Sequence, residues 1–197
     1  MANTTQDTSK TEIAQNAMEQ FLKDNYKIFI DTCSLLDPAA DKFWMNIIPM
    51  LHTYGTKIIV PVRCTEEIQK HMTNPDLALR AKDTIKKLKQ LQEAGYIDLR
   101  GEQSDNFADN VFNVVFTKFR MQHNLLLITQ DRDLAEDILK LNDSKSVTNA
   151  KHVCVKKINQ YGYLSNIYPK SVKVSSVKKS SQKGEVYYKE LIPDEEK

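Results

Sequence analysis

The stretch LLLITQD at residues 125–131 decides the fold class. Four apolar residues in a row that end at polar ones are typical of a strand buried on both faces of a sheet. Other apolar runs rich in β-forming residues lie at residues 26–30, 57–60, 96–99 and 152–155. Because parallel strands are joined by crossover helices, the alternation of such runs with helical patterns predicts an α/β fold, a three-layer α/β/α sandwich around a mostly parallel sheet.

Helical spacing of apolar residues fills the intervals between these runs. We expect helices at residues 9–21, 65–72, 76–93, 104–121 and 131–141. A further helical pattern covers residues 44–54, but Pro49 lies inside it. Proline lacks the backbone donor that a helix interior uses, so Pro49 is expected to kink or split that helix.

Length and composition predict one globular domain with extensions. The chain has 197 residues, of which 41% are hydrophobic and 27% are charged. We expect an N-terminal helical extension at residues 1–24, a globular domain at residues 25–164 and a polar, low-complexity and flexible tail at residues 165–197. Within the tail, residues 186–191 are apolar enough to form a short strand or a docking segment.

Charge, hydropathy and cysteine usage narrow the class of protein. A formal charge of +2 neither demands nor excludes a nucleic-acid partner. No apolar run is long enough to span a bilayer and no secretory signal is visible, so no membrane partner is expected and the cytoplasm is the predicted compartment. Three widely spaced cysteines, Cys33, Cys64 and Cys154, are expected to be reduced core thiols.

Carboxylates follow the ends of two predicted strands. Asp31 comes directly after the run at residues 26–30, and Asp131 follows the run at residues 125–128 after Thr129 and Gln130. The carboxyl ends of parallel strands share one edge of the sheet, which is where ligands bind in such folds. We therefore expect Asp31 and Asp131 to lie near each other at that edge.

Further acids fall in the predicted first turns of helices that begin at the same edge. They are Glu66 and Glu67 after the second strand, and Asp105 and Asp109 after the third. Two carboxylates about 4 Å apart repel by roughly 4 kcal/mol at an effective dielectric near 20, so a cation must offset the repulsion or one acid must stay protonated. Oxygen ligands without nearby histidine or cysteine favour Mg²⁺ or Mn²⁺, the ions that serve phosphodiester cleavage.

Three segments resemble the motifs of the PIN-domain family of metal-dependent nucleases. FIDTCSLL at residues 29–36 looks like the family's opening motif, an acid and a small hydroxyl residue after the first strand. Val60-Pro61 followed by Glu67-Ile68 resembles its second motif, and LITQDRDL at residues 127–134 is similar to its final strand, hydroxyl residue and acid. The resemblance spans about residues 26–163.

The resemblance implies a divalent-metal endoribonuclease that cuts single-stranded or loop RNA. The catalytic and metal-binding residues that it implies are Asp31, Glu67, Asp109 and Asp131, with Asp133 as a fifth metal ligand and Thr32 and Thr129 in support. Two alternatives stay open, namely Glu66 in place of Glu67 and Asp105 in place of Asp109. The family also includes members that act with an inhibitor or regulatory protein, or as a homodimer.

Basic residues near the inferred crevice are candidates for contacts to the RNA backbone. They are Arg63, Lys70 and Arg132. A lysine-rich face at residues 80–89 more often marks a solvated helix surface than a binding site. His71 and His123 lie outside the acidic pattern and receive no role.

Competing hypotheses explain the same acids differently. Asp131 and Asp133 could cap a helix, and Glu67 and Asp109 could stabilise helix dipoles, so only the set of acids argues for catalysis. A catalytically silent PIN-like module that binds RNA or a protein is the main alternative. A phosphatase of the haloacid-dehalogenase type needs a second acid two residues after the first, and Cys33 occupies that position.

Overall fold

A computed structural model of the chain describes residues 4–101, 108–143 and 152–167, with side chains from residue 12 onward except at residues 108–110. Within these residues the chain forms one sheet of six strands and seven α-helices. The strands are β1 (Lys27–Ile30), β2 (Ile58–Pro61), β3 (Ile97–Arg100), β4 (Leu125–Ile128), β5 (Val153–Ile158) and β6 (Leu164–Asn166). The helices are α1 (Thr4–Lys23), α2 (Thr32–Leu35), α3 (Ala40–Tyr54), α4 (Val62–His71), α5 (Ala78–Glu93), α6 (Ala108–Phe119) and α7 (Arg132–Leu139), which continues into the 3₁₀ turn η1 (Lys140–Asp143).

The sheet is mostly parallel, as the sequence predicts. Its strand order is β3-β2-β1-β4-β5-β6, in which the first five strands run parallel and β6 pairs antiparallel with β5. The order of connection reverses between β1 and β4, because β2 and β3 extend the sheet on one side of β1 and β5 extends it beyond β4. A reversal of this kind opens a crevice at the carboxyl ends of the strands.

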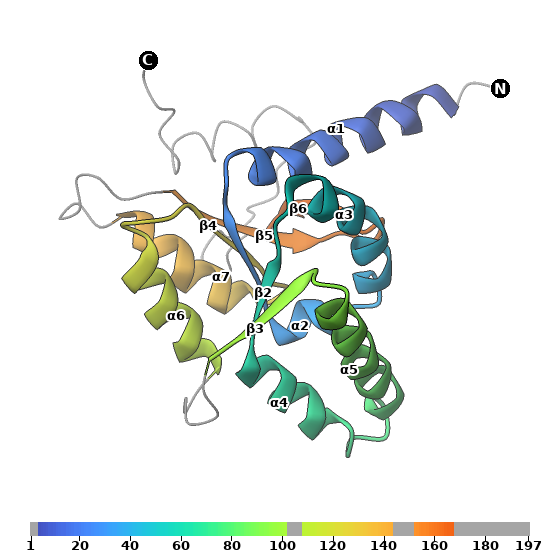
Figure 1. Cartoon of the computed structure of the whole chain (residues 1–197), viewed down its shortest axis with the longest axis vertical. Helices are drawn as coiled ribbons and strands as arrows, with labels where there is room; N and C mark the ends of the chain where they lie inside the picture. The colour runs from blue at the N-terminus through green and yellow to red at the C-terminus, as the bar shows by residue number, and fades with distance from the viewer. Residues whose placement is uncertain (1–3, 102–107, 144–151, 168–197) are drawn as a thin grey trace, which may run out of the picture.

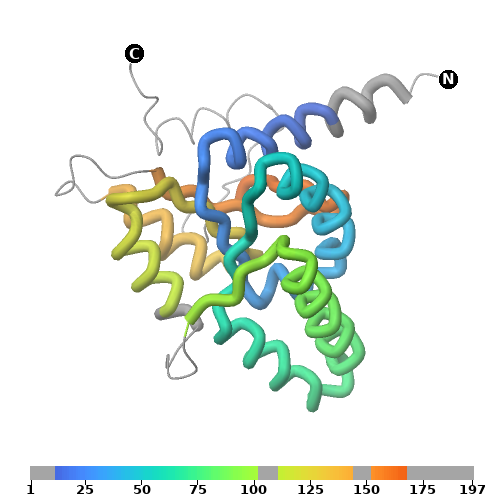
Figure 2. Tube along the Cα trace, in the orientation of Figure 1, coloured from blue at the N-terminus to red at the C-terminus, as the bar shows by residue number. Residues whose placement is uncertain are grey.

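Helices cover both faces of the sheet. Figure 1 shows α6 and α7 on one side and α3 and α5 on the other, while α1 packs against α3 and β6. The short helix α2 after β1 and the helix α4 after β2 begin at the lower end of the sheet as drawn (Figure 1 and Figure 2). This arrangement is compatible with a three-layer sandwich, and it leaves the carboxyl edge of the central strands to loops and helix starts.

The core lies on both sides of the central strands. All four residues of β4 are buried, which explains its uninterrupted apolar sequence. Ile28 and Ile30 of β1 are buried on one face, and Phe29 lies on the other, where its ring centroid is 5.2 Å from that of Phe116 in α6. Burial on both faces holds the ends of β1 and β4 in fixed register, which is the condition for a precise site at those ends.

Pro49 does not split its helix. The helix α3 is continuous from Ala40 to Tyr54 with Pro49 inside it, and Pro49 is exposed. A proline frees the carbonyl four residues earlier, and that residue, Met45, is also exposed. Water can therefore satisfy the freed carbonyl, which is why the helix tolerates the proline.

Several element boundaries differ from those predicted. The helix α4 begins at Val62, directly after Pro61, so the expectation that Glu66 and Glu67 lie in its first turn is wrong. Thr65, predicted as the first helical residue, lies inside α4, where its hydroxyl donates to the Val62 carbonyl at 2.6 Å. Residues 104–107 of the helix predicted at residues 104–121 lie outside the described residues.

In the part of the chain that the structure describes, no helix is both long and apolar enough to cross a membrane.

Candidate active site

Asp31 and Asp131 leave the sheet from adjacent parallel strands. Ile30 of β1 is in register with Ile128 of β4, and the backbone N–H of Asp31 donates to the Ile128 carbonyl at 3.1 Å. Asp31 is the next residue after β1, and Asp131 follows β4 after two residues. Both acids therefore lie at the point where the strand order reverses.

Asp31 is a buried carboxylate held by two donors. Its side chain is almost inaccessible, with 4% of the residue surface exposed. The backbone N–H of Ser34 donates to Oδ1 at 2.8 Å, which caps the short helix α2, and the hydroxyl of Thr129 donates to Oδ2. Burial raises the pKa of Asp31 to about 6, the hydrogen bonds from Thr129 and Ser34 oppose the rise, and the charge of Asp131 adds to it.

Thr129 connects the two aspartates. It is fully buried, and the same hydroxyl oxygen that donates to Asp31 accepts the backbone N–H of Asp131 at 2.9 Å. The Oδ1 atom of Asp131 in turn accepts the backbone N–H groups of Asp133 at 2.7 Å and Leu134 at 3.2 Å. Asp131 thus caps α7 through one oxygen, as one of the competing interpretations expects, while Asp133 is exposed in the first turn.

Glu67, and not Glu66, lies beside the opening motif. The hydroxyl of Thr32 donates to Oε2 of Glu67 at 2.7 Å, and Thr32 is the neighbour of Asp31 in sequence. Glu66 instead accepts a hydrogen bond and ion pair from Arg63 at 2.8 Å. The geometry favours Glu67 of the two alternatives that the sequence leaves open.

Cys64 lies beneath this part of the site. It is buried, with its Sγ 4.0 Å from the Ile30 carbonyl. Burial raises the pKa of the Cys64 thiol to about 12, and the charges of Asp31 and Glu67 contribute to the rise. Cys64 and the half-buried Cys154 fit the prediction of buried thiols, whereas Cys33 is exposed, because it is on the outer side of α2.

The structure does not describe the side chains of the other two candidate acids, Asp109 and Asp105. The backbone of Asp109 is at the start of α6, but its side chain lies outside the described residues, and so does all of Asp105. Among the side chains that are described, no three from aspartate, glutamate, histidine and cysteine are grouped so as to hold a metal ion. The described site therefore consists of Asp31 and Asp131, joined by Thr129, with Glu67 attached through Thr32.

The chemistry of these donors fits a hard divalent cation. They are carboxylate and hydroxyl oxygens, which Mg²⁺ and Mn²⁺ prefer. Within the described residues, no lysine or arginine forms an ion pair with Asp31, Glu67 or Asp131. The raised pKa of Asp31 has a repulsive contribution from Asp131, which is the unfavourable interaction that a bound cation offsets.

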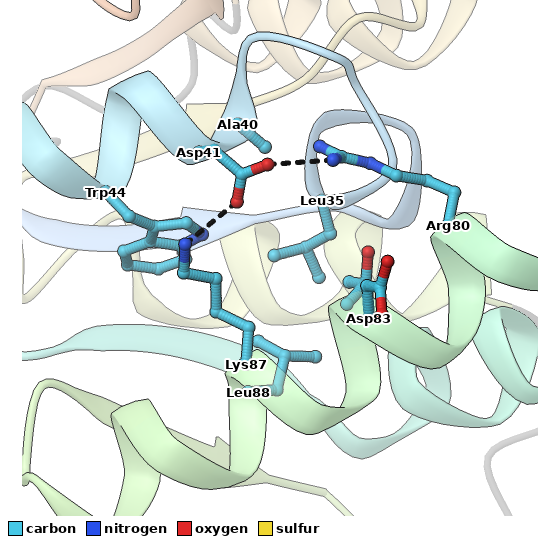
Figure 3. A pocket seen from close by; sticks show the side chains of 9 residues that line it. Leu35, Ala40, Asp41, Trp44, Arg80, Asp83, Lys87 and Leu88 are labelled. Carbon is cyan, nitrogen blue, oxygen red and sulfur yellow. Dashed lines mark hydrogen bonds and ion pairs between the residues drawn. The ribbon is translucent and has the colours of Figure 1, made fainter.

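The basic residues named in the sequence lie in different settings. Lys70 and Arg132 are exposed, and Arg63 is half-buried against Glu66. Arg80 and Lys87 of the lysine-rich face reach across to Asp41 of α3, each at 2.8 Å, around a cavity of about 30 Å³ (Figure 3). A cavity of that size holds about one water molecule, so these ion pairs fix α5 against α3 and do not form a ligand site.

Ser34 is the residue of the site that the sequence analysis missed. Its backbone N–H donates to Asp31, and its buried hydroxyl donates to the Ile128 carbonyl at 3.2 Å. The available signal was the three-residue spacing between Asp31 and Ser34, which is the spacing between a helix cap and the N–H group that it accepts.

Comparison of the chain with models of known protein families and with characterised proteins finds no match.

Proposed function

We propose that the chain is a divalent-metal-dependent endoribonuclease of the PIN type, a hydrolase of RNA phosphodiester bonds. The observation that carries the proposal is the buried carboxylate of Asp31 at the reversal of the strand order, coupled through Thr129 to Asp131. Burying a carboxylate is costly when, as for Asp31 among the described residues, no ion pair offsets its charge, and sites that keep such a group are commonly functional. The mostly parallel sheet and the placement of the acids at its carboxyl edge support the PIN-like assignment of residues 25–164.

In this proposal, the acids hold the cation and the hydroxyl residues orient the acids. The ligands are Asp31, Glu67 and Asp131, with Asp109 from the start of α6 and Asp133 from the first turn of α7. Mg²⁺ or Mn²⁺ supplies, when bound, the charge that activates water and stabilises the leaving oxygen of a phosphodiester. The chain's own contribution is to present carboxylate oxygens in fixed positions.

Thr32 and Thr129 would restrict the carboxylates to one orientation each. Each hydroxyl uses its single proton on a carboxylate oxygen, on Glu67 at 2.7 Å for Thr32 and on Asp31 for Thr129. The donated bonds leave lone pairs on both acids for other ligands. Residues in this position commonly change metal affinity or activity by about 10- to 100-fold when they are replaced.

The proposed substrate is single-stranded or loop RNA. The exposed Lys70 and Arg132 and the half-buried Arg63 lie on the two helices that carry Glu67 and Asp133. They are suited to contacts with phosphates, which position a strand without reading its sequence. The near-neutral charge of the chain implies that this contact is local.

A catalytically silent module that binds RNA or a protein is the second candidate. One observation favours it, namely that the described side chains do not include three metal-binding groups close together. It differs from the first candidate in requiring neither metal nor cleavage.

Cleavage of mixed-structure RNA and of matching single-stranded DNA, with Mg²⁺, with Mn²⁺ and with a chelator, tests the proposal. The variants are Asp31→Asn and Asp131→Asn, and the control is Asp137→Asn, an exposed acid on the same helix as Asp133. We expect metal-dependent cutting of RNA that both site variants lose and the control keeps. RNA binding without cleavage in any metal would favour the silent module, and cleavage that survives both site variants would refute the acidic site.

A further inference from the structure

A groove of about 510 Å³ runs along the α6 face of the sheet, from Lys27 and Lys57 at the amino ends of the strands to Pro61 and Arg100 at the carboxyl ends of β2 and β3, and its lining does not include Asp31, Glu67 or Asp131. Its floor is made by residues of neighbouring strands that point to the same face, among them Phe29, Ile59 and Leu125. Its wall is the side of α6 that carries Val111, Val115 and Phe119. The volume is within the range of ligand-binding pockets, and the lining is mainly apolar.

Among the described residues, the polar rim of the groove is mainly basic, with Asp98 as its one acid. Lys27 and Lys57 lie at the starts of β1 and β2, and Arg100 and His123 lie at other points of the border. Arg100 pairs with Asp98 at 2.7 Å, but within the described residues neither Lys27 nor Lys57 takes part in an ion pair. An occupant that fits is therefore an apolar segment with flanking negative charge.

We propose that the C-terminal segment of this chain, EVYYKELIPDEE at residues 185–196, docks into this groove. The segment has an apolar part, Val186, Tyr187, Tyr188, Leu191 and Ile192. It also has five acids against one lysine, the complement of the basic rim. Docking would bury half-exposed groove residues such as Ile59 and Val115, and this apolar burial favours binding. The attraction between the acids of the segment and the basic rim would set the orientation of the bound segment.

The tether is long enough for docking within one molecule. Ile167 is buried at the end of the described residues, and residues 168–184 connect it to the segment. Seventeen residues span up to about 60 Å when extended, whereas a domain of this size has a radius of gyration of only about 16 Å. A tether of such length gives an effective concentration near the millimolar range, so even a weak contact is populated.

A single strand of RNA fits the groove less well. Its floor is largely aliphatic, and stacking of bases needs exposed aromatic faces. Phe29 is buried and Phe119 is half-buried. Lys27 and Lys57 alone would also contribute little electrostatic free energy to the binding of a nucleic acid.

Competition between the tethered segment and a free peptide tests the docking. The probe is a fluorescent peptide of residues 184–197, and its anisotropy is followed with a chelator present and no RNA, so the result does not depend on the proposed nuclease activity. The full chain is compared with a full chain whose own segment is disabled by Leu191→Asp and Ile192→Asp. We expect the peptide to bind the disabled chain at least tenfold more tightly than the unaltered chain.

A matched pair of substitutions on α6 locates the binding. In the disabled chain, Val115→Glu changes the groove wall, whereas Val114→Glu changes the neighbouring residue, which is 63% exposed and not part of the lining. We expect Val115→Glu to weaken peptide binding at least tenfold and Val114→Glu to leave it unchanged. Lys57→Glu changes an exposed residue on the rim and should also weaken peptide binding. This variant replaces Val115→Glu in the test if circular dichroism shows that Val115→Glu does not fold.

Three results would overturn the proposal. These are no binding of the peptide to the disabled chain, equal binding to the disabled and unaltered chains, and binding that neither Val115→Glu nor Lys57→Glu weakens. If a uridine oligonucleotide binds in a manner sensitive to Val115→Glu while the peptide does not bind, the groove is a nucleic-acid site and the proposal is again wrong.

Discussion

The hydroxyl of Thr129 donates a hydrogen bond to Asp31, and the same oxygen accepts the backbone N–H of Asp131. One buried side chain therefore connects two acids that are a hundred residues apart in the sequence. Asp31 and Thr129 directly follow β1 and β4, and their backbone N–H groups donate to Ile128 of β4 and Lys156 of β5, so the adjacent strands hold this connection in place. The geometry of the candidate site is thus tied to the packing of the core.

Removing the Thr129 hydroxyl should affect both stability and activity. In Thr129→Val, a buried carboxylate oxygen of Asp31 and the partly buried N–H of Asp131 lose their hydrogen-bond partner. Loss of such partners costs about 1–3 kcal/mol of unfolding free energy, which thermal or denaturant unfolding will measure. Thr129→Ser keeps the hydroxyl and should retain most of the stability; if both variants are equally stable, the hydrogen bonds contribute nothing.

Asp31→Asn should stabilise the metal-free protein at neutral pH. The pKa of Asp31 is about 6 in the folded chain against an ordinary value of 3.8, so keeping it ionised at pH 7 costs about 3 kcal/mol at most. As the pH falls from 6 to 4, the folded state binds a proton that the unfolded state does not, and the unaltered protein gains stability.

The stability difference between Asp31→Asn and the unaltered protein should therefore be largest above pH 6 and should vanish near pH 4. Urea unfolding across this pH range, with a chelator present, measures it. A variant that is less stable than the unaltered protein at pH 7 would contradict the raised pKa.

Glu67→Gln and Glu66→Gln should separate the two neighbouring acids. Glu67 accepts the Thr32 hydroxyl beside Asp31, whereas Glu66 pairs with Arg63. Under the proposed function, Glu67→Gln lowers the cleavage rate by about 10-fold or more, and Glu66→Gln changes it little. Single-turnover cleavage of one labelled RNA compares them, and the reverse ranking would assign the role to Glu66.

Alkylation should distinguish the thiols. Cys33 is exposed, whereas Cys64 is buried and has a pKa of about 12, so almost none of it is thiolate at pH 8. We expect iodoacetamide to label Cys33 first in the folded chain, as mass spectrometry of tryptic peptides will show. Labelling of Cys64 at a comparable rate before unfolding would mean that the region beneath Asp31 opens readily.

Gly162→Ala should destabilise the fold strongly. A Cβ at Gly162 would lie 2.5 Å from the Lys42 carbonyl carbon and the Phe43 nitrogen of α3, so the turn between β5 and β6 could not stay in place. Gly95 is the matched control, because it has a similar φ of +81° against +79° but no atom within 4 Å of an added Cβ.

Gly95→Ala carries only the cost of the left-handed backbone, about 1–2 kcal/mol. Gly162→Ala should lose more than Gly95→Ala in denaturant unfolding. Equal losses would show that α3 moves aside at little cost.

Local patterns predicted the parallel strands well, because each buried strand is an apolar run with its own signal. β6 escaped prediction, since Leu164 is its one apolar residue and its place depends on pairing with β5. The helix α2 also escaped prediction, because it has only four residues; Asp31, predicted as a metal ligand, caps it.

The choice between Glu66 and Glu67 could not be made from the sequence. Adjacent helical residues point about 100° apart, so the choice depends on how the helix is placed against the sheet. The helix begins at Val62 after Pro61, three residues before the predicted start. The contact with Thr32 is a tertiary contact, and local patterns do not contain it.

Titration of the chelator-treated protein with Mn²⁺ by calorimetry tests most directly whether this acidic site binds a divalent cation. The unaltered chain is compared with Asp31→Asn and with Asp137→Asn, whose altered acid is exposed on α7 and pairs with Lys140. The proposed metal site requires Mn²⁺ binding in the unaltered chain and in Asp137→Asn, and loss of this binding in Asp31→Asn. Equal binding by all three proteins, or no binding by any of them, would contradict it.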